Sequence, residues 1–229
     1  PAKLPWKDQG VDFVIESTGI FTNREAAGQH LNAGAKKVLI SAPGKDVDKT
    51  IVYGVNHQLL QSSDVIVSNG SCTTNCLAPI ALILNNSVGI KKGFMTTVHA
   101  YTGDQRSLDG NHSDPRRARA SNMSIIPTST GAAKSLGKVI PELDGKLDGT
   151  AVRVPIPNVS MIDLSFLANQ DTSREEINRH FKKASKNDLR KILGYNELPL
   201  VSIDFNHSAY SSIFDSTQTE VVDKNFVRV

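Results

Sequence analysis

Residues 65–84 read VIVSNGSCTTNCLAPIALIL, which is an apolar β-branched run, a short polar turn and a long apolar segment. A strand-forming run that passes through a glycine-containing turn into a helical pattern predicts a strand–turn–helix unit of an α/β protein. Cys72 stands at the predicted start of the helix. The amide donors and the dipole at a helix N-terminus stabilise an anion, so a cysteine there can lose its proton more easily than a free one. A reactive nucleophile is the first hypothesis.

Other interpretations of Cys72 and Cys76 remain open on this pattern alone. They could be two small buried side chains on one helical face, because free cysteine is among the most often buried residue types. A metal pair is less favoured, since these are the only cysteines and no histidine pair nearby completes a site. We therefore expect no metal. A disulfide is also disfavoured, because side chains four residues apart on a helix could meet only with distortion.

A nucleophilic cysteine needs a second catalytic group, and His99 is the candidate. Residues 94–98 are apolar and β-branched enough to predict a strand, and His99 falls where this strand gives way to a polar run. Such a histidine can face a cysteine at a neighbouring turn, hold the thiolate, and move a proton to or from the reacting oxygen. The other histidines lie in polar contexts that predict surface or loop positions: His30, His57, His112, His180 and His207.

The first 71 residues alternate predicted strands and helices. This order is typical of the second half of a Rossmann-type dinucleotide-binding domain, whose parallel sheet binds its ligand at the carboxyl ends of the strands. Short polar turns follow two of these strands, although simple chain reversal would explain them as well. The predicted elements are strands at 11–16, 37–41, 51–55 and 65–68 and a helix at 23–32.

From Cys72 onward the strands no longer alternate regularly with helices. This pattern predicts a mixed, mainly antiparallel sheet with helices on one face. The chain is therefore predicted to combine an α/β domain over residues 1–71 with an α+β catalytic domain over residues 72–229. The predicted elements are helices at 72–85 and 173–185 and strands at 94–100, 150–155, 160–167 and near 201–205.

Composition narrows the possible functions. The 229 residues include 39% hydrophobic and 21% charged residues, with a formal net charge of +3. This length is ample for one large domain, or for one domain and part of another. No stretch approaches a membrane span and no leader pattern opens the chain, so we expect no membrane association. Two cysteines without a disulfide framework indicate a reducing compartment, and we expect a cytoplasmic protein.

A polar segment extends over residues 101–123 and contains the basic run Arg116-Arg117-Ala118-Arg119. A loop of this length in a compact enzyme is usually functional or held by a partner. The arginines could form a nucleic-acid patch, but the small net charge and the lack of interleaved aromatic residues argue against it. Phosphate contacts and salt bridges are the favoured roles, and no nucleic-acid partner is expected.

Several separate motifs together carry a family resemblance. These are VSNGSCTTNCLAP at 67–79, TTVHAYTGDQ at 96–105, RRARA at 116–120, PTSTGAAK at 127–134 and RVPIPNVS at 153–160. In the order, spacing and residues of these motifs, the chain resembles phosphorylating glyceraldehyde-3-phosphate dehydrogenases of the bacterial and organellar type. The resemblance extends from VDFVIESTG at 11–19 to FVRV at 226–229. The resemblance implies glyceraldehyde 3-phosphate and inorganic phosphate as substrates, NAD as cofactor, and a homotetramer with the 101–123 loop at its core.

The family also has segments that this sequence does not show. Its members open with a glycine-rich strand–turn–helix for the cofactor pyrophosphate and an acidic residue for the adenosine ribose. Neither precedes Pro1, and the family's closing helix does not follow Val229. The chain is therefore expected to be an internal piece of the enzyme. The residue that determines whether the family prefers NAD or NADP is expected to lie outside it.

The resemblance assigns roles to individual residues. Cys72 is the implied nucleophile and His99 its base. Each serine or threonine could instead be an ordinary cap or turn residue, and Asp104 is expected to orient Arg153 or a hydroxyl rather than touch phosphate. The implied substrate-phosphate residues are Thr102, Asp104 and Arg153; the inorganic-phosphate residues are Ser71, Thr73, Thr130, Gly131 and Arg117; the cofactor residues are Ser17, Thr18, Gly19, Ser41, Ala42 and Gly103.

These residues suit one reaction. A thiolate that attacks an aldehyde forms a hemithioacetal, which oxidation converts into a thioester, and phosphate attack then releases an acyl phosphate. The product implied is 1,3-bisphosphoglycerate, in glycolysis or gluconeogenesis. Two alternatives remain open: an erythrose-4-phosphate dehydrogenase, which the HAYT motif at 99–102 disfavours, and a non-catalytic binding or assembly fragment of the enzyme.

Overall fold

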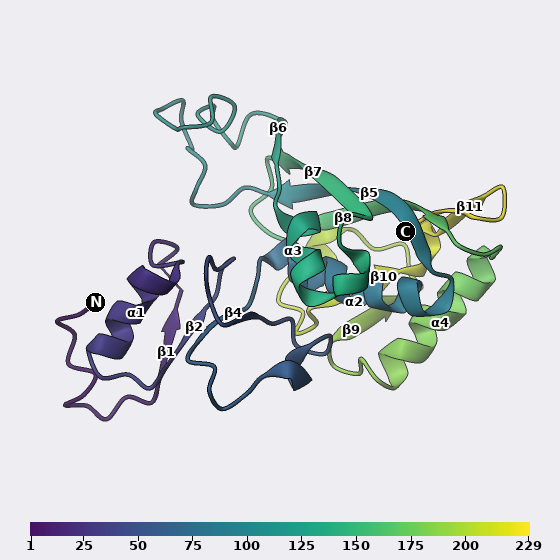
Figure 1. Cartoon of the computed structure of the whole chain (residues 1–229). Helices are drawn as coiled ribbons and strands as arrows, with labels where there is room; N and C mark the ends of the chain where they lie inside the picture. Colours follow the sequence, from purple (N-terminus) through teal and green to yellow (C-terminus); the bar gives the residue numbers. More distant parts are fainter.

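The computed structural model describes residues 1–229 and contains two main sheets. The first, here the N-terminal sheet, has four parallel strands in the order β1-β2-β4-β3. Figure 1 shows it at the left, in purple and blue. The predicted parallel α/β unit is confirmed. Its strands are β1 (Phe13–Glu16), β2 (Lys37–Ile40), β3 (Lys49–Thr50) and β4 (Ile66–Ser68).

One helix, α1 (Arg24–Asn32), packs on the N-terminal sheet against β2 and β4. It begins where the Asn23 side chain accepts a hydrogen bond from the Ala26 amide at 2.8 Å, which satisfies one of the free donors of the first turn. The small core beneath it consists of Ala27, Val38, Ile40 and Ile66. On the opposite face Phe13 and Ile15 are exposed.

The predicted strand at 51–55 is wrong. The Asn56 side chain accepts from the Val52 amide at 2.8 Å and donates to the Thr50 carbonyl at 3.0 Å, so it takes backbone groups that a strand would pair with a neighbour. Gly54 has a positive φ of 86°. The chain turns here, and a short 3-10 helix follows at His57–Leu59.

The helix α2 (Cys72–Ser87) connects the two sheets and confirms the predicted strand–turn–helix unit. Gly70 turns the chain with a φ of 67°, which is a left-handed conformation that favours glycine. The Ser71 side chain then caps the helix by accepting from the Thr74 amide at 3.0 Å. Cys72 is therefore the first helical residue, as the sequence predicts.

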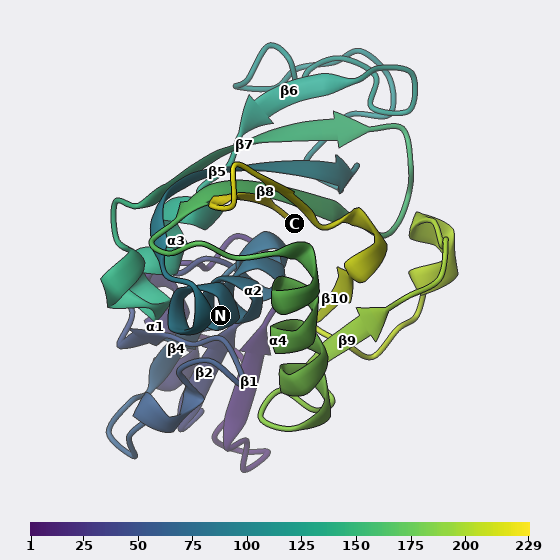
Figure 2. The ribbon, with the colours of Figure 1, turned by 90° about the vertical axis from the view of Figure 1, so that its right-hand side faces the viewer.

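The large sheet has six strands in the order β11-β12-β8-β5-β7-β6. Only β5 and β7 run parallel, and the other four pairings are antiparallel. Figure 2 shows α2, α3 and α4 below this sheet, which confirms the mainly antiparallel arrangement with helices on one face. Its elements are β5 (Ile90–Ala100), β6 (Ile126–Ser129), α3 (Ala132–Val139), β7 (Leu147–Val154), β8 (Met161–Ala168), α4 (Arg174–Lys186), β11 (Glu220–Val222) and β12 (Phe226–Arg228).

The main hydrophobic core lies between the large sheet and its helices and contains 27 buried residues. Leu77 and Leu84 of α2, Leu136 of α3 and Phe181 of α4 all point into it. Burial of this apolar surface is the dominant favourable term in folding. It fixes α2 against the sheet, and so fixes the position of Cys72. None of the helices is both long and apolar enough to cross a membrane.

The predicted strand near 201–205 is also wrong, because Ser202–Phe205 forms a 3-10 helix. The Asp204 carboxylate accepts from the Val201 amide at 2.8 Å, and the apolar side chains Val201 and Ile203 are exposed rather than packed in a core. The flanking parallel strands β9 (Leu193–Asn196) and β10 (Ser212–Asp215) form a separate two-stranded sheet. Two further 3-10 helices lie at Pro141–Leu143 and Ser216–Gln218.

Candidate active site

Cys72 and His99 are brought together from separate elements. Cys72 begins α2, His99 is the penultimate residue of β5, and the Cys72 Sγ lies 3.2 Å from the His99 Nε2. The hydrogen bond with His99 lowers the pKa of the Cys72 thiol from 9.0 to about 7, although partial removal of the thiol from water opposes this change. His99 is buried and Cys72 is exposed. A substantial share of the thiolate therefore exists near neutral pH at an accessible position.

Cys76 lies one helical turn further on and has a different environment. Its Sγ lies 3.3 Å from the Ser212 Oγ, and burial raises the pKa of its thiol. Both cysteines are free, so they do not form a disulfide. The nearby sulfur of Cys76 is thus protonated at neutral pH, where Cys72 is the better nucleophile.

Arg153 of β7 is a neighbour of His99 by strand register, because the parallel pairing of β5 with β7 places the two residues opposite each other. Its Nη1 lies 2.8 Å from the His99 Nδ1 and donates to the Ala100 carbonyl at 3.0 Å. Arg153 is half-buried and forms no salt bridge with a carboxylate of the chain, and its buried Nε has no hydrogen-bond partner. A partly desolvated guanidinium without a carboxylate is suited to bind an anion.

Asp104 does not orient Arg153, contrary to the expectation from sequence. It binds Arg117, whose Nη1 lies 2.8 Å from the Asp104 Oδ2. Burial works against ionisation of Asp104, but hydrogen bonds from Arg117 and His112 outweigh it and hold the pKa of Asp104 below its ordinary value. Both aspartate and arginine belong to the polar loop of residues 101–125, which Figure 1 shows projecting from the sheet at upper left.

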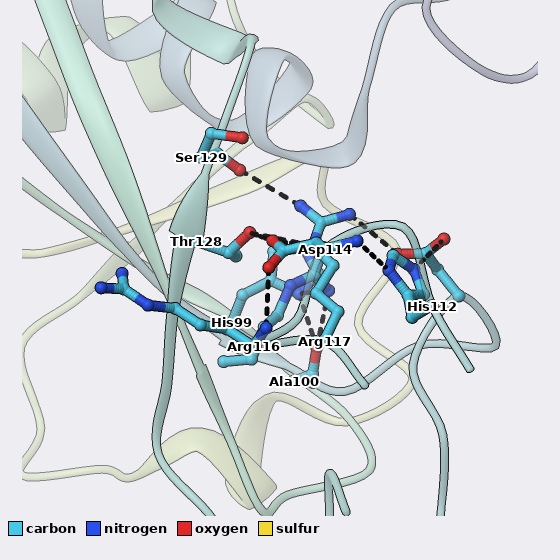
Figure 3. A network of polar contacts seen from close by, with 10 residues as sticks. His99, Ala100, His112, Asp114, Arg116, Arg117, Thr128 and Ser129 are labelled. Atoms are coloured by element: carbon cyan, nitrogen blue, oxygen red, sulfur yellow. Dashed lines mark hydrogen bonds and ion pairs between the residues drawn. The ribbon is translucent and has the colours of Figure 1, made fainter. Parts of the chain in front are cut away.

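Further contacts fix the position of Arg117 (Figure 3). Its Nε donates to the Thr128 Oγ1 at 2.9 Å and its Nη2 to the Ser129 carbonyl at 3.3 Å, so the guanidinium is attached to β6. The Thr128 hydroxyl in turn donates to Asp114 at 3.0 Å. These contacts hold Arg117 beside the turn at Thr130 and Gly131, which leads into α3.

The residues assigned to inorganic phosphate gather at two helix starts. Ser71 and Thr73 lie at the start of α2, and Thr130 and Gly131 directly precede α3, which packs against α2. The hydroxyls already have structural partners, because Ser71 caps α2 and the Thr130 Oγ1 accepts from the Ala132 amide at 3.2 Å. Thr73 is buried. Helix N-termini still offer free amide donors for an anion.

The residues assigned to the cofactor divide into two groups. Ser17, Thr18 and Gly19 follow β1, and Ser41 and Ala42 follow β2, at the carboxyl edge of the N-terminal sheet. The Ser41 amide donates to the Glu16 carbonyl at 3.0 Å, and the Asn69 amide to the Ile40 carbonyl at 2.9 Å. The turns after β1, β2 and β4 are therefore adjacent, and the third leads into Cys72. Gly103 is exposed in the 101–125 loop, as is Thr102.

A buried polar network behind the first turn is not apparent from the sequence. Glu16 accepts from the Thr18 amide at 2.7 Å and lies 2.9 Å from the His30 Nε2, while Trp6 donates to the His30 Nδ1 at 3.1 Å. Burial alone would raise the pKa of Glu16, but the hydrogen bonds from Thr18 and His30 lower it. His30 is only 5% exposed, so its predicted surface position is wrong. The signal available in the sequence was a charged residue at an inward position of an alternating strand.

Comparisons with known proteins point to a single family. Residues 71–229 match the family described as glyceraldehyde 3-phosphate dehydrogenase, C-terminal domain. Over 229 residues the chain is 60% identical to the glyceraldehyde-3-phosphate dehydrogenase of Xanthobacter flavus, covering 100% of this chain and 68% of that protein. It is 58% identical over 221 residues to the Pseudomonas aeruginosa enzyme of the same name, covering 96% and 66%.

A third relative is glyceraldehyde-3-phosphate dehydrogenase 1 of Bacillus subtilis, with 55% identity over 230 residues, covering 100% of this chain and 69% of that protein. The chain thus spans about two thirds of the length of these relatives. The matched region covers both sheets of this chain. The chain belongs to the glyceraldehyde-3-phosphate dehydrogenase family.

Proposed function

We propose that the protein oxidises glyceraldehyde 3-phosphate and phosphorylates it with inorganic phosphate, with Cys72 as nucleophile and NAD as cofactor. The observation that carries the proposal is the 3.2 Å contact between the Cys72 Sγ and the His99 Nε2, at a helix start adjoining the carboxyl edge of a parallel sheet. Nucleophile, base and cofactor edge thereby meet at one place. We also propose that residues 1–71 are the cofactor domain and residues 72–229 the catalytic domain.

The chemistry of the chain's own residues begins at sulfur. The Cys72 thiolate attacks the aldehyde carbon, and the carbonyl oxygen takes the proton that His99 accepted from the thiol, which makes it the hydroxyl of a hemithioacetal. His99 holds a hydrogen bond to this oxygen and takes its proton when the carbon is oxidised, which leaves a thioester on Cys72. Phosphate then attacks the thioester carbon, the carbon–sulfur bond breaks, and the thiolate is restored as the acyl phosphate leaves.

The reaction involves two phosphate groups, and we assign each of them to a different arginine. Arg153, beside His99 and without a carboxylate partner, suits the phosphate that the substrate already carries. Arg117, held at β6 near the start of α3, suits the incoming inorganic phosphate together with the amides at the α2 and α3 starts. Thr102 belongs to the first group by its position three residues after His99.

The carboxyl edge of the N-terminal sheet fits NAD. Ser17, Thr18, Gly19 and Ser41 are exposed there, and no atom lies within 4 Å of the position that a Cβ at Gly19 would occupy. A ligand can therefore lie against the backbone of these turns, where open parallel sheets bind dinucleotides. When bound, NAD supplies the acceptor for the two electrons that leave the hemithioacetal carbon.

We further propose a cytoplasmic homotetramer. The long projecting loop of residues 101–125 contains the buried side chain of Gln105, whose amide nitrogen and oxygen have no partner within the chain. Buried polar groups usually have a partner, and a rearrangement of this loop against a second subunit would supply one. A reducing compartment suits the reaction, since the nucleophile works only as a free thiolate.

The test is a phosphate-dependent turnover assay with the purified chain. Reduced NAD should form from glyceraldehyde 3-phosphate only when inorganic phosphate is present, and mass spectrometry should find the acyl group on Cys72 when phosphate is withheld. Cys72→Ser is the control and should abolish both signals, whereas Cys76→Ser should retain them. Faster turnover of erythrose 4-phosphate would reassign the substrate, and no acyl group with either aldehyde would indicate a non-catalytic binding or assembly role.

A further inference from the structure

One buried hydroxyl connects two of the turns at the carboxyl edge of the N-terminal sheet. Ser68, the last residue of β4, is 0% exposed. Its Oγ donates to the Ala42 carbonyl at 2.7 Å and accepts from the Gly44 amide at 2.9 Å and the Gly70 amide at 3.0 Å. A hydroxyl has one proton to donate and two lone pairs with which to accept. The structure uses all three, although the reaction proposed above gives Ser68 no role.

The two connected turns carry different parts of the proposed site. Residues 41–44, here the cofactor turn, follow β2 and include two residues assigned to NAD. Residues 69–71, here the nucleophile turn, lead directly into Cys72. The carbon that is oxidised is bonded to the Cys72 sulfur, and the proposed electron acceptor lies against the cofactor turn. The separation of the two reacting groups therefore depends on how firmly the two turns are joined.

The two turns are anchored unequally by apolar packing. The helix α2 is held in the main core of 27 buried residues, whereas the core of the N-terminal sheet has 4. The position of the cofactor turn consequently depends more on its hydrogen bonds. These bonds reach the turn after β1 as well, because the Lys45 amide donates to the Thr22 carbonyl at 2.9 Å and its carbonyl accepts from the Arg24 amide at 3.1 Å.

The close approach of the cofactor turn to Ser68 requires a glycine at position 44. A Cβ there would lie 2.8 Å from the Ser68 Cβ and 2.7 Å from the Val47 Cγ1, which is closer than real Cβ atoms approach other atoms. Gly44 thus lets the backbone come within hydrogen-bond distance of the hydroxyl. Any side chain at this position would push the cofactor turn away from Ser68.

We propose that Ser68 is a positioning residue for the oxidation step, and that its hydroxyl fixes the cofactor turn relative to the nucleophile turn. The inference rests on the proposed function in one respect, namely that the cofactor turn binds NAD. Loss of the hydroxyl frees the cofactor turn, but the start of α2 keeps its other contacts. There the Asn75 Nδ2 donates to the Asn69 carbonyl at 2.7 Å and to the Ser71 carbonyl at 2.9 Å.

Hydrogen exchange tests the connection without cofactor or substrate. In Ser68→Ala the amides of Gly44 and Gly70 lose their acceptor, and both should exchange about tenfold faster. Ser216→Ala is the matched control, because Ser216 is also buried and its hydroxyl donates to the Asn196 carbonyl at 2.7 Å, in the two-stranded sheet. It should leave both glycine amides unchanged. Unchanged exchange at either glycine in Ser68→Ala overturns the proposal.

Two rates measured at Cys72 separate positioning from general damage. With phosphate withheld, the acyl group should form on Cys72 about tenfold more slowly in Ser68→Ala, because small displacements of reacting groups have large effects on rate. Iodoacetamide should alkylate Cys72 at the wild-type rate, since α2 keeps its anchors. An unchanged acylation rate overturns the proposal, and so does an equal slowing of both reactions, which would indicate a disturbed nucleophile.

Gly44→Ala provides a second variant if Ser68→Ala does not fold. It keeps the hydroxyl and displaces only the cofactor turn, so acylation should again be slow while alkylation stays normal. Normal acylation in this variant overturns the proposal. A wild-type chain that forms no acyl group would instead refute the proposed function, on which the positioning role depends, and would leave the result of the exchange measurement unaffected.

Discussion

The Trp6 indole donates to the His30 Nδ1 across 3.1 Å, and this contact determines which nitrogen of the imidazole carries the proton. Because an indole N–H can only donate, Nδ1 must accept, and the ring proton resides on Nε2. The Nε2–H then donates to Glu16, 2.9 Å away, whose other oxygen accepts from the Thr18 amide. Trp6, which precedes β1, thus helps to fix the turn at Thr18, which follows β1.

Trp6→Phe should loosen this turn while keeping an aromatic ring in place. Removal of the donor leaves the buried Nδ1 unsatisfied, and we expect the free energy of unfolding to fall by about 1–3 kcal/mol. The Thr18 amide should exchange its hydrogen faster, because the His30–Glu16 contact no longer has a fixed tautomer. Denaturant unfolding and hydrogen exchange measure the two effects. Unchanged exchange at Thr18 would show that the network does not reach the turn.

Cys72 should react with iodoacetamide far faster than Cys76. The hydrogen bond with His99 lowers the pKa of Cys72 to about 7, whereas burial raises that of Cys76. Since a lowered pKa means that the thiolate is present above it and lost below it, labelling of Cys72 should increase through pH 7 and level off above. Peptide mass spectrometry after timed quenching gives both rates. Equal, slow labelling would rule out an activated thiol.

His99→Gln should move the alkylation profile of Cys72 toward that of an ordinary cysteine. The largest cause of the lowered pKa of Cys72 is the hydrogen bond with His99, and without it only the hydrogen bonds of Thr73 still oppose the rise that partial desolvation causes. At pH 7 we expect the alkylation rate to fall about tenfold or more. Below the pKa of the thiol, each unit by which this pKa rises lowers the fraction of thiolate about tenfold. His57→Gln, at an exposed histidine, is the control. A profile that does not move would assign the activation to the helix start alone.

Gly70→Ala should destabilise the protein through its backbone rather than through a clash. The φ of 67° is costly for a residue with a Cβ, and the nearest atom to that Cβ would be Thr74 Cβ at 3.6 Å, an ordinary contact. We expect a loss of about 1–2 kcal/mol in the free energy of unfolding. Gly103→Ala, where no atom lies within 4 Å and φ is not positive, should be near neutral. Similar values for both variants would contradict this role for Gly70.

Local sequence patterns are enough to predict most of the helices and strands around the site and the position of the nucleophile. Runs of apolar and β-branched residues predict β1, β2, β4 and three of the six strands of the large sheet, β5, β7 and β8, and the polar turn before Leu77 predicts that Cys72 starts a helix. These predictions succeed because periodicity and caps are local properties. The wrong strands at 51–55 and 201–205 are apolar runs in which the side chain of Asn56 or Asp204 takes the backbone hydrogen bonds instead.

Contacts between residues that are distant in the chain follow from the folded arrangement and not from local patterns. That Asp104 binds Arg117 rather than Arg153 depends on the path of the 101–125 loop, and that Arg153 faces His99 depends on the register of two parallel strands. The burial of His30 depends on Trp6 and Glu16, which lie 24 and 14 residues away in the chain. Long-range packing sets such contacts, and no local pattern encodes it. The reactive thiol can therefore be predicted from the sequence, whereas the contacts that activate it form only when the chain folds.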